Sequence, residues 1–255
     1  MNSSYATALA GARQLVANAT QVAVLTGAGM SQESGMPTFR DAQTGWWERY
    51  QPEELASPKG WRADKALVYA WYCTRAATVR RSLPNRGHQA LAAFQRHQPS
   101  TRVITQNVDD LHERAGTSDV IHLHGQLNRL RCFACRREGG PLTLPELEGA
   151  CFRERIEPPR CRHCGGYLRP DVVWFGEVLP EGSWQEALEV VQTCDLLVIV
   201  GTSLQVQPAS TLPTLAARHG AKLIEVNPDP DGDPYPPRVR LTATAAKALP
   251  DLLPS

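Results

Sequence analysis

The chain has 255 residues, of which 42% are hydrophobic, and a formal net charge of only +1. The hydrophobic content excludes wholesale disorder, and the near-zero charge argues against a dedicated DNA- or RNA-binding surface. Residues 1–16 have no apolar run of signal-peptide length, and the run at 196–200 is too short to cross a bilayer, so we expect a cytoplasmic protein with no membrane partner. We also expect a monomer with no sequence-specific nucleic-acid partner.

The first predicted elements are a helix and a buried strand that ends in glycines. Apolar residues recur at helical spacing over 6–19, and residues 21–26 form a β-type run leading into the glycines at 27 and 29. A dinucleotide-binding α/β domain begins in this way. Similar runs follow at 102–105, 196–200 and 221–227. Runs of this kind are typical of parallel strands with helices on both faces, so we predict an α/β fold with a Rossmann-like, doubly wound parallel sheet.

Two segments between these runs have a different character. Residues 41–83 are rich in tryptophan and helix formers, with a helix predicted over 63–81. Residues 132–164 are rich in proline, glycine and arginine and contain too few apolar residues for a core of their own. The second segment therefore needs a stabilising group other than a hydrophobic core.

Four of the seven cysteines form two C-x-x-C pairs. Cys132 and Cys135 make the first pair and Cys161 and Cys164 the second, with 25 residues between them. A two-residue gap lets both thiolates of a pair face one ion, and two pairs complete a tetrahedron. We therefore predict one structural zinc ion rather than a redox dithiol. The arginines beside the first pair leave a nucleic-acid-binding zinc ribbon open as an alternative.

The glycine-rich loop at residues 27–35 reads GAGMSQESG and departs from the G-x-G-x-x-G of ordinary dehydrogenases. Its glycines permit a tight turn and close approach of the backbone to a pyrophosphate, and Ser31 and Ser34 add hydroxyl donors. Taken alone, such a loop is more often only a tight connection between a strand and a helix.

This loop and several later motifs together resemble the sirtuins. Residues 27–40, GAGMSQESGMPTFR, are similar to the family's NAD-binding signature, and residues 105–112, TQNVDDLH, to a second family motif. Residues 122–125, HLHG, resemble the catalytic histidine box, and the cysteine pairs follow it in the family's order. The resemblance covers residues 20–249. It implies an NAD-dependent protein-lysine deacylase that acts on acylated lysine peptides and proteins and releases nicotinamide and O-acyl-ADP-ribose.

The resemblance also implies roles for individual residues. The implied general base is His124, because it is the one of four candidate histidines that combines the His-Gly pairing with the family's position. The other candidates are His88, His112 and His122. Asn107 and Asp109 are implied to hold the nicotinamide carboxamide. The implied NAD contacts are Gly27, Ala28, Gly29, Ser31, Glu33, Ser34, Gly35, Pro37, Thr38, Phe39, Arg40, Gln106, Asn107, Val108, Asp109, Gly201, Thr202, Ser203, Asn227 and Ala245.

Acyl selectivity is predicted from the helix at 63–81. Tyr72 and Arg75 are three residues apart, so both can project from one face, and a hydroxyl with a guanidinium makes a carboxylate receptor. The pair resembles that of class III sirtuins, which prefer succinyl- and malonyl-lysine, and Ala56 is small where that class is small. Acetyl removal is also expected. Alternatively, Arg75 is only a solvated charge on the helix that also carries Arg80 and Arg81.

Residues 173–176, VWFG, resemble the class III form of the segment that binds the substrate peptide. The backbone of Val173, Trp174, Phe175 and Gly176 is expected to pair with the peptide as an added strand.

Together these motifs predict a discontinuous Rossmann-like NAD-binding domain of residues 1–40, 84–128 and 168–255. It is interrupted by a helical insert at 41–83, which forms the acyl pocket, and by a zinc-binding module at 129–167. Two alternative functions remain: an NAD-dependent protein ADP-ribosyltransferase on the same scaffold, and a non-enzymatic zinc-ribbon binding protein.

Overall fold

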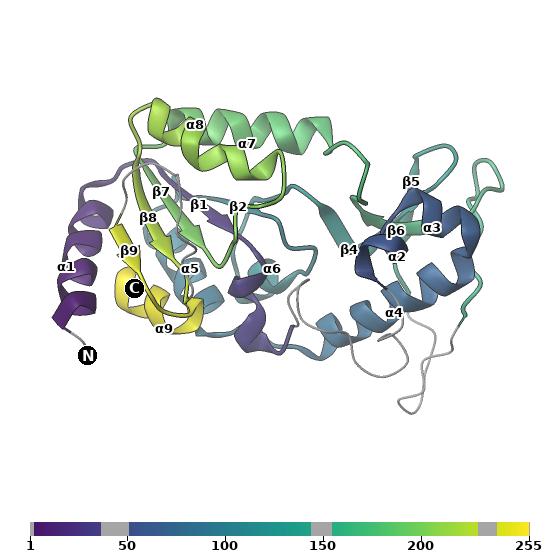
Figure 1. Ribbon diagram of the computed structural model, residues 1–255, viewed down its shortest axis with the longest axis horizontal. Coiled ribbons are helices and arrows are strands. Elements are labelled where there is room, and N and C mark those ends of the chain that lie inside the picture. The colour runs from purple at the N-terminus through teal and green to yellow at the C-terminus, as the bar shows by residue number, and fades with distance from the viewer. Residues whose placement is uncertain (1–2, 37–50, 144–154, 229–238, 255) are drawn as a thin grey trace.

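A parallel sheet of six strands forms the larger part of the fold (Figure 1). The computed structural model describes residues 3–36, 51–143, 155–228 and 239–254. Within them the strand order is β3-β2-β1-β7-β8-β9, with every neighbouring pair parallel. The predicted doubly wound α/β fold is confirmed. The strands are β1 (Val22–Thr26), β2 (Arg102–Thr105), β3 (Val120–His122), β7 (Leu196–Val200), β8 (Lys222–Val226) and β9 (Val239–Leu241).

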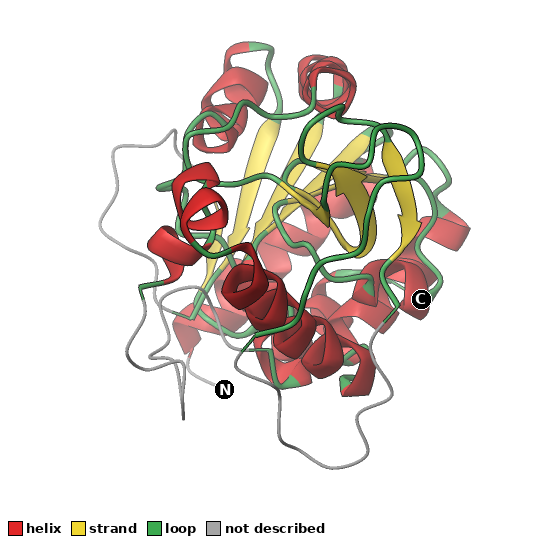
Figure 2. Cartoon of the chain, turned by 90° about the vertical axis from the view of Figure 1, so that its right-hand side faces the viewer, coloured by secondary structure: helices red, strands yellow, loops and turns green. Residues whose placement is uncertain are grey.

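Helices cover both faces of this sheet because its central strands are apolar on both sides. Val22 and Val24 of β1 face one hydrophobic cluster, while Ala23 and Leu25 face another. Figure 2 shows helices on both sides of the yellow strands. The first cluster includes α1 (Ser3–Asn18), α5 (Arg86–His97) and α9 (Ala245–Leu252), and the second includes α7 (Glu181–Thr193) and α8 (Leu212–Arg218).

A smaller antiparallel sheet packs with helices at the other end of the molecule (Figure 1). Its strand order is β5-β4-β6, and its residues share a third hydrophobic cluster with Trp61, Trp71 and Tyr72 from the helices. The helices and the strands of the cysteine-containing segment therefore bury one another. These elements are α2 (Pro52–Leu55), α3 (Pro58–Ala63), α4 (Lys65–Arg81), β4 (Gly125–Cys132), β5 (Glu138–Pro141) and β6 (Leu168–Val172).

The helix predicted over 63–81 is divided at Asp64. The side chain of Asp64 accepts a hydrogen bond of 2.9 Å from the backbone N–H of Leu67 and caps the start of α4, while α3 ends one residue earlier. The prediction therefore starts two residues too early. Among the described residues, no helix combines the length and the apolarity needed to cross a bilayer.

Candidate active site

Two loops cross at the carboxyl ends of β1 and β7. The N–H of Gly27 donates to the carbonyl of Val200 at 3.0 Å, and the N–H of Gly29 donates to that of Gly201 at 2.8 Å. A Cβ atom on Gly27 would lie 2.7 Å from Cβ of Thr202, and one on Gly29 would lie 2.8 Å from Cα of Gly201. Both glycines are thus needed for this crossing, whatever ligand approaches the loop. Ala28 lies between them, half-buried.

Ser31 joins the amide and the carboxylate predicted to hold nicotinamide. Its buried hydroxyl accepts a hydrogen bond from Nδ2 of Asn107 at 3.1 Å and donates one to Oδ2 of Asp109 at 3.0 Å. Burial raises the pKa of Asp109, although hydrogen bonds from Leu111 and Ser31 act in the opposite direction. Asn107 and Asp109 are therefore hydrogen-bonded to the same buried hydroxyl, which brings them close together, as a shared role in binding a primary amide requires.

His124 lies between β3 and β4 with one ring nitrogen already engaged. Its Nδ1 is 2.9 Å from the carbonyl oxygen of Gln106, and a carbonyl can only accept, so Nδ1 carries a proton. The neutral ring then has its lone pair on Nε2. Burial lowers the pKa of His124, while the bond to Gln106 acts in the opposite direction. The side chain is accordingly a neutral, oriented imidazole at physiological pH, which is the form that its predicted role as a base requires.

The three competing histidines are buried, whereas His124 is half-buried. Both ring nitrogens of His122 face oxygen atoms, with Nδ1 3.2 Å from the carbonyl of Asn107 and Nε2 2.7 Å from Oε1 of Glu113. His88 and His112 are buried edge to face, with ring centroids 4.9 Å apart. Burial lowers the pKa of His88 to about 4 and that of His112 well below its ordinary value. These contacts give all three histidines a structural role.

The protonation state of His124 leads to a prediction about pH. An imidazolium has no lone pair to accept a proton, so kcat/KM for deacylation should fall as pH drops through the pKa of His124. Because burial lowers that pKa, the fall should be centred below the ~6.5 of a free imidazole, with a plateau above it. A pH profile of kcat/KM on one acyl-lysine peptide measures this. A midpoint above ~7.5 would contradict the assignment, because it would require a raised pKa.

Two further predicted NAD contacts, Gln106 and Asn227, are hydrogen-bonded to Thr202. Its buried hydroxyl accepts a hydrogen bond of 2.8 Å from Nε2 of Gln106, and its carbonyl accepts one of 3.2 Å from Nδ2 of Asn227. Ser203, the next residue after Thr202, is exposed. The carbonyl of Val108, a further predicted contact, accepts a hydrogen bond of 2.8 Å from the N–H of Leu127. Residues after β1, β2, β7 and β8 therefore meet at one edge of the sheet, where parallel α/β sheets bind ligands.

Three further predicted contacts lie at the outer side of the glycine loop. The carboxylate of Glu33 accepts a hydrogen bond of 3.0 Å from the N–H of Ala246 in the first turn of α9, and Ala245 beside it is buried. Gly35 has a φ of 81°, which glycine adopts freely, and ends the second 3-10 turn of the loop. The remaining predicted contacts lie outside the described residues: Pro37, Thr38, Phe39 and Arg40.

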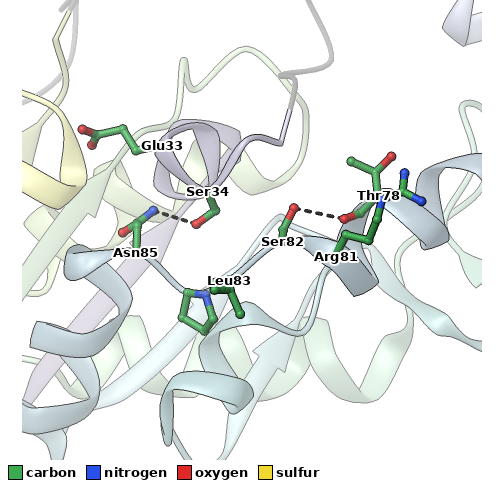
Figure 3. Close-up of a pocket in the computed structure, with 8 residues that line it drawn as sticks. Glu33, Ser34, Thr78, Arg81, Ser82, Leu83 and Asn85 are labelled. Carbon is green, nitrogen blue, oxygen red and sulfur yellow. Dashed lines mark hydrogen bonds between the residues drawn. The ribbon is translucent and has the colours of Figure 1, made fainter.

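An open cavity of about 460 Å³ lies on this outer side, between the loop and the ends of α4 and α5 (Figure 3). Nδ2 of Asn85 bonds Oγ of Ser34 at 3.1 Å and the carbonyl of Met30 at 2.8 Å, so Asn85 fixes the loop. Neither His124 nor Tyr72 lines this cavity. Its lining residues are Glu33, Ser34, Thr78, Arg81, Ser82, Leu83, Pro84 and Asn85.

Tyr72 and Arg75 lie against aromatic side chains rather than in solvent. Tyr72 is only 2% exposed, and its hydroxyl accepts a hydrogen bond of 2.8 Å from Nε1 of Trp174. The guanidinium of Arg75 lies over the Trp71 ring, 5.1 Å from its centroid. Burial lowers the pKa of Arg75, and Tyr72 acts in the opposite direction; burial also raises the pKa of Tyr72, which therefore keeps its proton. Arg75 is thus more than a solvated charge.

The segment predicted to bind the peptide already uses several of its backbone donors. The N–H of Val173 donates to the carbonyl of His124 at 2.8 Å, and that of Phe175 donates to the carbonyl of Ala56 at 3.0 Å. The N–H of Trp174 donates to Oε2 of Glu177, also at 3.0 Å. The segment, which ends at Gly176, therefore connects His124 to the turn between α2 and α3, and a substrate strand would have to pair with its other backbone groups.

The four predicted zinc ligands lie within one coordination sphere. Their sulfur atoms are all within 4.8 Å of one another, with Cys132 3.5 Å from Cys164 and Cys135 3.8 Å from Cys161. Zinc–sulfur bonds of about 2.3 Å in a tetrahedron place the sulfurs about 3.8 Å apart. The cluster therefore fits a zinc ion held by four thiolates, with no open position for a water molecule or a substrate.

Comparison with known proteins finds relatives of one family. A sequence profile described as the Sir2 family matches residues 27–208. The chain is also similar to NAD-dependent protein deacylase 1 of Pseudomonas aeruginosa, with 49% identity over 243 residues that cover 94% of this chain and 96% of that protein.

Two solved structures have the same fold. A Sir2 homolog in complex with NAD has a TM-score of 0.85 and 39% identity and covers 96% of this chain and 92% of its own. A Sir2 homologue variant in complex with 2'-O-acetyl ADP ribose has a TM-score of 0.84 and 40% identity and covers 94% and 93%.

Proposed function

Because the chain belongs to the Sir2 family and is an NAD-dependent protein deacylase, we propose that it removes succinyl and malonyl groups from lysine, and also acetyl groups. The observation that carries this proposal is the position of two side chains on α4: Tyr72 is buried, and Arg75 is half-buried with its guanidinium over the Trp71 ring. A neutral acyl group has no need of a guanidinium at its end. A carboxylate does, because a charge taken out of water must be paired.

The energetics of the pair favour an acid-ended acyl group. Burial lowers the pKa of Arg75, and an incoming carboxylate would favour the charged guanidinium through a charge-assisted hydrogen bond. Tyr72 keeps its proton and adds a second donor. Ala56, whose carbonyl is bonded to Phe175, has a small side chain, as an acyl chain longer than acetyl would require.

We further propose that the residues at the edge of the parallel sheet perform the chemistry. NAD, when bound, supplies the nicotinamide leaving group and the ribose that accepts the acyl group. Asn107 and Asp109 hold the carboxamide, and Ser31 orients both of them. Nε2 of His124 takes a proton from a ribose hydroxyl, and the charge that develops on the ring is stabilised through Nδ1 by the carbonyl of Gln106.

The other assignments rest on the same proposal. The glycine loop, Thr202, Ser203, Asn227 and Ala245 would hold the rest of NAD, and Val173–Gly176 the substrate peptide. The division into an NAD-binding domain (1–40, 84–128, 168–255), a helical insert (41–83) and a zinc-binding module (129–167) remains our proposal. So do a cytoplasmic location, which would keep the four thiolates reduced, and a monomeric state, which light scattering would test.

Replacing Arg75 tests the acyl preference. The R75M variant keeps most of the side-chain volume but removes the charge, and losing one partner of a buried charge pair costs about 2 kcal/mol or more. We expect kcat/KM for a succinyl-lysine peptide to fall at least ~30-fold, and that for the acetyl-lysine peptide of the same sequence to fall much less. The matched control is R80M, which removes an exposed arginine of the same helix. Equal losses with both peptides would refute the carboxylate receptor.

A further inference from the structure

Tyr72, which belongs to the proposed acyl site, accepts a hydrogen bond from the predicted peptide-binding segment at residues 173–176. Trp174 is 1% exposed, and its Nε1–H donates to Oη of Tyr72 at 2.8 Å across 102 positions of sequence. An indole N–H can only donate, so the hydroxyl of Tyr72 is the acceptor in this bond. The proton of Tyr72 is thereby left for a different acceptor.

A cation also stacks on the indole ring of Trp174, and an ion pair holds this cation in place. The fully buried guanidinium of Arg169 lies 3.6 Å from the centroid of the Trp174 ring and bonds Oε2 of Glu177 at 2.7 Å. Arg131 bonds the same oxygen at 3.0 Å, and so does the backbone N–H of Trp174. One carboxylate therefore fixes the backbone of Trp174 and also the cation stacked on its ring.

We propose that Trp174 is a positioning residue for acyl selectivity, which acts through Tyr72. Its N–H occupies the acceptor side of the Tyr72 hydroxyl and so directs the phenol proton toward the terminal carboxylate of the acyl group. The Glu177–Arg169 pair keeps the indole in the orientation that this bond requires. The inference rests on the proposed preference for succinyl- and malonyl-lysine and adds a residue outside the Tyr72–Arg75 pair.

The test measures the ratio of desuccinylase to deacetylase kcat/KM in the full-length zinc-loaded protein. The W174F variant keeps an aromatic ring against Arg169 but loses the N–H. We expect this ratio to fall ~10-fold, mainly through a higher KM for the succinyl-lysine peptide. In the Y72F background the same substitution should produce no further fall, because the acceptor of the bond is already absent.

A matched control separates the hydrogen bond from packing. Trp61 is 3% exposed and lies in the same aromatic cluster, with its ring centroid 5.6 Å from that of Trp174. The W61F variant should leave the ratio within about twofold of wild type. A fall as large as that of W174F would show that packing is responsible and would overturn the proposal. The indole ¹⁵N–¹H resonance missing from W174F should also shift in Y72F and not in R80M.

The remaining outcomes are decisive for one proposal or the other. If Y72F lowers the ratio and W174F does not, the role of Trp174 is refuted and the acyl preference stands. If neither Y72F nor R75M lowers the ratio, or wild type does not remove succinyl groups, the acyl preference fails and the role of Trp174 fails with it.

Discussion

Replacing His124 with alanine should lower kcat for deacylation by ~10²–10⁴, the range that general acid–base catalysis contributes. The variant loses the lone pair on Nε2 that receives the ribose proton, while the backbone bonds of the segment remain. Among these, the carbonyl of His124 still accepts the N–H of Val173 at 2.8 Å. Steady-state kinetics with an acyl-lysine peptide and NAD would measure the loss.

Two controls make the His124 result specific. Affinity for NAD, measured by calorimetry, should change little in H124A, and H97A, which removes an exposed histidine of α5, should keep wild-type kcat. Mass spectrometry should detect O-acyl-ADP-ribose with wild type and much less with H124A. Unchanged turnover in H124A would refute its role as the base, and ADP-ribosylated protein in place of O-acyl-ADP-ribose would favour the transferase alternative.

The sequence predicted the central strands well because of their burial. Strands β1, β2, β7 and β8 are covered on both faces, so β1 and β7 are almost wholly apolar and β2 and β8 contain short apolar runs beside polar residues. Strands β3 and β9 have three residues each, too few to produce a recognisable pattern. Strand β4 carries asparagine and arginine within it, and its apolar residues face the helices across a bulge, so alternation is broken there.

The candidate residues of the site could be named from the sequence, but most of the contacts between them could not. Motifs indicate which side chains are candidates for the chemistry, because amides, carboxylates and imidazoles are visible in a sequence. The bond between Trp174 and Tyr72 was not predictable, since it joins positions 102 apart. Glu177 was missed as well, although it directly follows the VWFG segment. Glu177 pairs with arginines of the antiparallel sheet, and these arginines are too far away in the sequence for a local pattern to reveal the ion pairs.

Removing zinc should unfold the end of the molecule that contains the antiparallel sheet. Apparent binding energies of structural zinc reach about 10–16 kcal/mol, which matches or exceeds the total stability of a typical domain, about 5–15 kcal/mol. Phe133 lies inside the first cysteine pair and packs against Trp61 and Trp174, with centroids 5.9 and 6.2 Å away. Loss of the metal should therefore release β4–β6 together with α3 and α4, and abolish deacylation.

Amide hydrogen exchange would locate this effect. Chelation should remove protection from β4, β6 and α4 and leave it in β1, β2, β7 and β8, because the parallel sheet has hydrophobic clusters of its own. C161S should behave like the chelated protein, whereas C194A, which alters a buried cysteine outside the cluster, should keep zinc and activity. Full protection and activity after verified metal loss would show that the ion is dispensable. Loss of protection throughout the chain would instead show that both sheets unfold as one cooperative unit, so that zinc stabilises the NAD site as directly as the acyl site.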